Sequence, residues 1–201
     1  MRVAGIVQPL LGDLRCLGCR APGAALCRRC ALLLRRAGAA APDGVMAVWV
    51  YEGTARSLIL ALKARGSRAA AEPLVEGMWR LALAHGVTAE VVSWVPGRRR
   101  DIRRRGFDHG EVLARGVARR LGLPACGLLR RTGARPDQTS LGAAERRANA
   151  AGAFRARARS CPARVLLVDD LVTTGATVRS CASVLDVQGA VRVDAVTACR
   201  A

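Results

Sequence analysis

The stretch VLLVDDLVTTGATVRS, residues 165–180, predicts a buried strand that ends in two acids and turns through a Thr/Gly loop into a helix. Open parallel sheets bind ligands at the carboxyl ends of their strands. The loop offers backbone N–H groups at the start of a helix, and these suit a phosphate. Asp169 and Asp170 would repel a phosphate in contact, so we expect them to accept hydrogen bonds from sugar hydroxyls beside it. The stretch predicts a ribose 5-phosphate site; two solvated acids or a receiver-type acidic pocket are the alternatives.

The rest of the chain alternates between strand and helix patterns. Apolar runs predict strands at 45–51, 90–96, 165–168 and 191–199, and apolar residues at helical spacing predict helices within 53–66, 70–85, 111–124 and 176–187. Asp108 and Glu111 fit a capping box at the start of the third helix. Residues 35–44 are typical of a linker, and residues 128–154 are polar and irregular. This alternation predicts an α/β fold with a mostly parallel sheet flanked by helices.

The chain is strongly basic. Its 201 residues carry a formal charge of +18, with 32 Arg, a single lysine (Lys63) and only 15 acids. Such a field attracts polyanions: nucleic acid, nucleotides or phosphorylated sugars. No run of about 18 apolar residues predicts a membrane span, and the first residues lack a convincing cleavage site, so we expect a cytoplasmic protein.

Four of the eight cysteines lie close together near the beginning of the chain. They follow the pattern Cys16-x2-Cys19-x7-Cys27-x2-Cys30. Two Cys-x-x-Cys pairs can offer four thiolates to one tetrahedral Zn²⁺, and a segment this short needs metal binding to supply its folding energy. Two disulfides or a redox pair are the alternatives, but disulfides are rare in the cytosol. The scattered cysteines, which are Cys126, Cys161, Cys181 and Cys199, are expected to be small core residues.

The opening stretch resembles the phosphoribosyl-pyrophosphate (PRPP) motif of type I phosphoribosyltransferases. The similarity covers 13 contiguous residues, VLLVDDLVTTGAT. It implies that Asp169 and Asp170 hold the 2′ and 3′ hydroxyls of the ribose. It also implies that the 5′-phosphate is cradled by five loop residues, Thr173, Thr174, Gly175, Ala176 and Thr177.

The order of motifs along the whole chain resembles the ComF family. The cysteine pattern is followed by YEGTARSLILALKARG, VPGRRRDIRRRGFDHG and RPDQTSLGAAERRANAAGAF, and then by the PRPP motif. The resemblance implies a zinc module and linker over 1–44, a phosphoribosyltransferase-like domain over 45–201, and a role in DNA uptake during competence. The chain departs from the family pattern Arg-Gly-Phe-Asn-Gln at Asp108 and His109. Asp can replace Asn as a helix cap, whereas any role of the Gln side chain is in doubt at His109.

Several cationic residues are candidates for the pyrophosphate. The resemblance places Lys63 near it; an exposed helix lysine is the alternative. Gly97 and Arg98 occupy the place of the pyrophosphate loop, within a run of six arginines that ends at Arg105, the member expected to be catalytic. The run can bind pyrophosphate, track a nucleic-acid backbone or be a solvated face. The segment with Gln138, Arg146, Arg147 and Asn149 is a mobile lid or a plain surface loop.

Three functions fit these residues. The chain can transfer the ribosyl group of PRPP with Mg²⁺, with Asp169, Asp170, Lys63 and Arg105 as catalytic residues. It can instead bind PRPP without transferring it, because function lives in the site rather than in the fold. The charge and the zinc module also fit binding of single-stranded DNA, although stacking aromatics are scarce, and the resemblance implies the DNA-uptake machinery as a partner. The acceptor and the oligomeric state are not specified by any motif.

Overall fold

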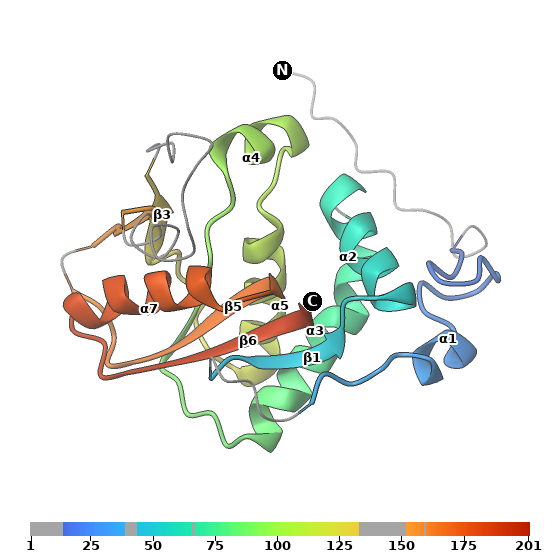
Figure 1. Ribbon diagram of the computed structural model, residues 1–201, viewed down its shortest axis with the longest axis horizontal. Helices are drawn as coiled ribbons and strands as arrows, with labels where there is room; N and C mark the ends of the chain where they lie inside the picture. The colour runs from blue at the N-terminus through green and yellow to red at the C-terminus, as the bar shows by residue number, and fades with distance from the viewer. Residues whose placement is uncertain (1–13, 39–43, 66, 133–151, 159) are drawn as a thin grey trace.

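The computed structural model describes residues 14–38, 44–65, 67–132, 152–158 and 160–201. Its centre is a four-stranded parallel sheet in the order β1-β6-β5-β2 (Figure 1). The strands are β1 (Met46–Val50), β2 (Val91–Trp94), β5 (Arg164–Val172) and β6 (Arg192–Arg200). The expected mostly parallel α/β fold is therefore confirmed.

Helices cover both faces of this sheet (Figure 1). The helices α2 (Gly53–Arg65), α3 (Arg68–Ala84) and α5 (His109–Leu121) lie on one face, and α7 (Ala176–Val187) lies on the other. The side chains of β5 alternate between the two: Leu166 and Val168 pack with α3 and α5, while Val165 and Leu167 pack with α7. Both faces of the sheet are buried, as is usual for parallel sheets.

The expected helices and strands are confirmed, with small shifts at their ends. α3 ends at the predicted place, with His85 as its C-cap. β5 is longer than expected, because it continues through both acids to Val172. No helix in the described part of the chain is long and apolar enough to cross a membrane.

Two regions differ from the sequence-based expectation. The arginine run contains a short helix, α4 (Arg99–Arg105), which ends at Gly106 with a φ of 81°. The region expected to be irregular contains an antiparallel hairpin, β3 (Leu129–Arg131) and β4 (Phe154–Ala156). Strands of three residues carry too little periodicity to be recognised from sequence.

The cysteine segment contains one short helix, α1 (Arg28–Leu32). The cysteine segment packs against the main core through three leucines that flank this helix, Leu17, Leu26 and Leu34. The chain then runs along β1: Ala37 N–H donates to the carbonyl of Val48, and Val50 N–H donates to the carbonyl of Arg35. Residues 35–37 are therefore not a free linker, and 39–43 lie outside the described residues.

Candidate functional site

The two acids of the opening stretch lie on opposite faces of the sheet. Successive side chains of a strand point to opposite faces, and both acids lie within β5. Asp170 faces α2 and α5, where it contacts Lys63 and His109. Asp169 faces α7, and its charge acts on Cys181 and on Arg131 of β3. The pair therefore presents one carboxylate to each side of the strand end.

Asp170 is the centre of a chain of polar contacts. Its Oδ2 lies 2.5 Å from Nζ of Lys63, and its Oδ1 lies 3.4 Å from Nε2 of His109. The other ring nitrogen of His109 lies 3.5 Å from Nη1 of Arg105. Lys63 comes from the end of α2, and Arg105 and His109 come from either side of the turn between α4 and α5. Residues of α2 and α5 thus contact one carboxylate, and Arg105 at the end of α4 reaches it through His109.

The pKa values of the two acids are displaced in opposite directions. Burial raises the pKa of Asp169 well above its usual range, and the neighbouring charge of Asp170 raises it further. Burial also acts to raise the pKa of Asp170, but the hydrogen bond with His109 and the charge of Lys63 outweigh it and hold that pKa well below its usual range. Closely spaced acids with divergent pKa values are typical of functional sites.

The loop after β5 places a glycine, threonine hydroxyls and the start of α7 next to the two acids. Gly175 has a φ of 70°, in the left-handed region that favours glycine, and directly precedes α7. Thr173 and Thr174 are exposed, and the Thr174 hydroxyl accepts a hydrogen bond from Ala176 N–H at 3.4 Å. Thr177 is exposed in the first turn of α7. Hydroxyls and the positive end of a helix dipole therefore meet beside the two acids.

Asp108 connects the loop after β2 with the start of α5. Its Oδ1 accepts from Gly110 N–H at 3.0 Å, which caps α5, and its Oδ2 accepts from Gly97 N–H at 2.9 Å. The first half of the expected capping box is confirmed, whereas Glu111 pairs with Arg115 instead. A side chain 8% exposed therefore fixes the loop that carries Gly97 and Arg98.

The loop that carries Gly97 and Arg98 leaves the sheet next to Asp169 and Asp170. β2 and β5 are parallel neighbours, with Trp94 paired to Val168. Val95 N–H donates to the carbonyl of Val168 at 3.0 Å, so β2 ends next to Asp169. The Gly97–Arg98 loop and the Thr173–Thr177 loop therefore follow the carboxyl ends of neighbouring strands.

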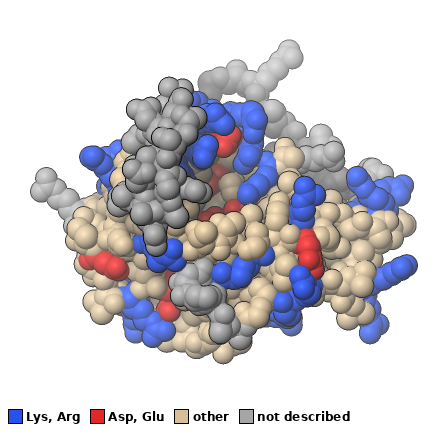
Figure 2. All heavy atoms as spheres, viewed as in Figure 1, with Lys and Arg blue, Asp and Glu red and all other residues tan. Residues whose placement is uncertain are grey.

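Basic side chains line a cavity beside Lys63, the partner of Asp170. A cavity of about 890 Å³ lies between α2 and α4, and its lining includes Lys63, Arg68, Arg104 and Arg105. Figure 2 shows Lys and Arg side chains around a hollow in which acidic side chains lie. This arrangement suits a ligand that carries phosphates at its ends and neutral hydroxyls between them.

The four clustered cysteines form a separate metal-binding arrangement. The sulfurs of Cys16, Cys19, Cys27 and Cys30 all lie within 4.8 Å of one another, and none is in a disulfide. Tetrahedral zinc–thiolate bonds of about 2.3 Å place sulfurs about 3.8 Å apart, so the cluster fits zinc.

The backbone around the cluster supports this fit. A Cβ on Gly18 would lie 2.8 Å from the sulfur of Cys30, so only glycine allows this close approach. Burial opposes ionisation of Cys16, yet backbone N–H groups that include Cys27 lower its pKa to about 6. Burial and the neighbouring thiols raise the pKa of Cys30 to about 12, so this thiol would lose its proton only when a metal ion binds.

The structure thus brings together Asp169, Asp170, Lys63 and Arg105, with the two loops at the adjacent strand ends. The sequence alone did not assign His109 to the site. The feature that could have indicated it is that His109 stands where the family pattern Arg-Gly-Phe-Asn-Gln has Gln. Of the scattered cysteines, Cys181 and Cys199 are buried as expected and Cys161 is half-buried, but Cys126 is exposed. The expected lid residues Gln138, Arg146, Arg147 and Asn149 lie outside the described residues.

Comparison with known proteins returned structural similarities only. No protein-family model and no curated protein sequence matches the chain. Solved structures similar to it include the allosteric regulatory enzyme of purine biosynthesis, at 22% identity and a TM-score of 0.45, over 64% of this chain and 26% of that one. The glutamine PRPP amidotransferase of B. subtilis is 23% identical, with a TM-score of 0.45 over 64% of this chain and 26% of that one. This chain therefore spans about a quarter of the length of both proteins.

A shorter protein is also similar. The adenine phosphoribosyltransferase of Leishmania tarentolae is 14% identical, with a TM-score of 0.43 over 72% of this chain and 74% of that one.

Proposed function

We propose that the chain binds PRPP together with Mg²⁺ at the carboxyl ends of β5 and β2. The 5′-phosphate binds the Thr173–Thr177 loop, and the ribose hydroxyls bind Asp169 and Asp170. The pyrophosphate binds the Gly97–Arg98 loop, with Lys63 and Arg105 as further cations. The observation that carries this proposal is the position of two carboxylates between two donor-rich loops on adjacent strands.

The charges of the site support this assignment. Asp170 is neutralised by Lys63 in the free chain. Ribose hydroxyls can donate to Asp170 while the Lys63 ammonium moves toward the pyrophosphate, because lysine is a flexible point charge with three donors. The carboxylates then contact the neutral part of the ligand, and the cations contact its anionic ends.

Magnesium fits the donors present. Mg²⁺ prefers oxygen ligands and is usually held by one or two carboxylates together with substrate phosphates. Asp169 offers such a carboxylate at the strand end. The ion supplies neutralisation of the pyrophosphate charge.

The order of motifs along the chain leads us to propose a domain organisation. We assign residues 1–44 to a ComF-like zinc module with its linker and 45–201 to the PRPP-binding domain.

A role in DNA uptake is the second candidate function. The observation that favours it is the row of exposed arginines on α4: Arg99, Arg100, Arg103 and Arg104. A labelled single-stranded oligonucleotide should bind with an affinity that falls steeply as salt rises. Binding that does not change with salt contradicts this role.

Calorimetric titration tests the PRPP proposal. PRPP should bind with Mg²⁺, and Asp169→Asn should weaken the affinity by about tenfold or more, the loss of one charge-assisted hydrogen bond. Asp186→Asn makes the same charge change on the exposed side of α7 and should leave affinity unchanged. No binding of PRPP with Mg²⁺ overturns the proposal. Pyrophosphate release with a panel of bases and amines then distinguishes transfer from binding alone.

A further inference from the structure

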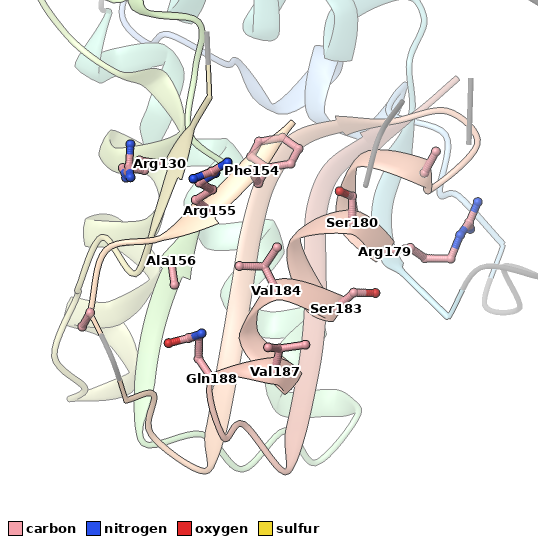
Figure 3. Close-up of a pocket in the computed structure, with 12 residues that line it drawn as sticks. Arg130, Phe154, Arg155, Ala156, Arg179, Ser180, Ser183, Val184, Val187 and Gln188 are labelled. Carbon is pink, nitrogen blue, oxygen red and sulfur yellow. The ribbon is translucent and has the colours of Figure 1, made fainter. Parts of the chain in front are cut away.

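A groove lies on the α7 face of the sheet, between α7 and the β3–β4 hairpin (Figure 3). Its volume is about 680 Å³, within the range of ligand-binding cavities. The lining of the groove follows α7 from Ala176 to Gln188. That length corresponds to about 18 Å of helix, or three turns. It shares no lining residue with the cavity around Lys63.

One wall of the groove carries a pair of opposed positive charges. Arg130 of β3 and Arg155 of β4 are directly paired in the antiparallel register, and both are exposed. Like charges directly opposite each other destabilise a strand pair. Neither arginine forms an ion pair with an acid in the described part of the chain, and no described residue lining the groove is acidic. An anionic partner would relieve this repulsion.

The opposite wall, on α7, combines aliphatic residues with four polar ones: Arg179, Ser180, Ser183 and Gln188. Val184 and Val187 of α7 face the hairpin across the groove, where Ala156 lies (Figure 3). Val187 is 82% exposed, so its apolar surface contributes little to the core of the chain itself. The groove therefore offers aliphatic contacts at Val184 and Val187 and positive charge at the hairpin, with Arg179 as a further positive charge on α7.

These walls favour a peptide over a nucleic acid. Phe154 is the aromatic residue of the lining, but it is 4% exposed and the guanidinium of Arg131 lies 4.6 Å from its ring centroid. It therefore gives a nucleobase no stacking platform, which single-strand binding uses. A second copy of this chain is disfavoured because its formal charge of +18 opposes self-association.

We propose that the groove between α7 and the β3–β4 hairpin docks an acidic segment of a protein partner, with aliphatic side chains against Val184 and Val187 and carboxylates against Arg130 and Arg155. Recognition combines apolar anchors along a helix with charge complementarity at one wall, as in other helix-in-groove contacts. The groove meets the proposed PRPP site at one end, where Ala176 of the Thr173–Thr177 loop lines it.

A displayed library of random peptides, about twelve residues long to match three turns of helix, tests the proposal on the full chain. Peptides that also bind the Arg130→Glu variant are removed during the selection. This variant keeps the hairpin, because the new glutamate pairs with Arg155 across the strands. Selected peptides should combine Asp or Glu with aliphatic residues. As synthetic peptides at about 0.15 M salt, they should bind Arg130→Glu about tenfold more weakly than the original chain.

Two further variants separate the apolar contact of the groove from the general effect of charge on the chain. Val187→Ser should weaken binding several-fold, since it removes exposed apolar surface without entering the core. Arg119→Glu makes the same charge change as Arg130→Glu at an exposed position of α5, on the other face of the sheet, and should bind as the original chain does. Failure to select peptides, selection of neutral or basic sequences, or equal binding by Arg130→Glu overturns the proposal. Displacement of the peptide by a twelve-nucleotide oligothymidine in an Arg130-dependent manner also overturns it, because the groove would then serve nucleic acid.

Discussion

The ammonium of Lys63 lies 2.5 Å from Oδ2 of Asp170, whose side chain is only 6% exposed. The only lysine of the chain therefore neutralises a buried carboxylate at the end of the central strand β5. A flexible ammonium can release this carboxylate when a ligand arrives, whereas the planar fork of an arginine is held more rigidly. The choice of lysine in a chain rich in arginine thus has a structural reason.

Replacement of Lys63 by methionine should destabilise the chain. It leaves Asp170 with His109 as its remaining partner, and the expected loss is about 2–3 kcal/mol, below that of fully buried pairs because Lys63 is partly exposed. Lys63→Arg keeps the charge and should retain most of the stability. Chemical denaturation of the three proteins measures this difference, and a methionine variant as stable as the original chain would contradict the role of the ion pair.

Removal of the charge of Asp169 and of Asp170 should shift the melting temperature in opposite directions. The pKa of Asp169 is raised in the folded chain, so its ionisation costs stability once the pH exceeds its unfolded pKa of about 4. Asp169→Asn should therefore raise the melting temperature at pH 7, and the gain should vanish below about pH 4. A change of about 1 kcal/mol moves the melting temperature of a chain this size by roughly 2–4 °C.

Asp170→Asn should lower the melting temperature at neutral pH. The pKa of Asp170 is lowered in the folded chain, so its stabilisation is complete above a pH of about 4 and is lost as the pH falls toward the folded value. Thermal melts of both variants across this range give the comparison. If both variants shifted the melting temperature in the same direction at neutral pH, the pKa values of the two acids would not be displaced in opposite directions.

Asp108 should couple helix stability to ligand affinity. Asp108→Ala removes both the cap of α5 and the bond to Gly97 N–H, and loss of the cap alone costs about 0.5–2 kcal/mol. Asp108→Asn keeps one acceptor oxygen and should lie between the alanine variant and the original chain. Melting temperature and PRPP affinity should fall in the same order, whereas affinity that is independent of this residue would separate the loop from the proposed site.

Gly175 tests the role of the phosphate-binding loop, and Gly189, which has a similar backbone conformation outside that loop, provides the control. Both have a positive φ, 70° and 102°, and they lie beyond opposite ends of α7. Alanine at either position should cost about 1–2 kcal/mol of stability, because side chains disfavour this backbone region. Only Gly175→Ala should weaken PRPP binding, since only this glycine lies in the Thr173–Thr177 loop. An equal effect on affinity from both variants would mean that stability alone is responsible.

The cysteine cluster should hold one zinc ion per chain. Cys30→Ser should abolish bound zinc, measured by elemental analysis, and should lower the melting temperature because metal binding contributes folding energy. Cys126→Ser alters an exposed cysteine outside the cluster and should leave the metal content unchanged. Full zinc retention in Cys30→Ser would exclude the four-cysteine site.

Sequence periodicity predicted the sheet and its major helices because buried elements of four or more residues carry a strong apolar pattern. It placed β5 too short, since two acids looked like the end of a strand although strand pairing continues beyond them to Val172. The opposite orientations of Asp169 and Asp170 follow from that extension. The contacts of Lys63 and His109 with Asp170 join residues far apart in sequence, and only tertiary packing determines which helix faces meet.

Residues 35–37 have a consequence for the fate of the chain without metal. They hydrogen-bond along β1, which is otherwise an outer strand of the sheet, and they follow directly from the cysteine cluster. An uncovered outer strand is a template for pairing with other chains. Loss of the metal would loosen this cover, so the edge of β1 would become open to pairing with another strand despite the positive charge of the chain. The cysteine cluster would then act as a guard against aggregation as well as a structural module.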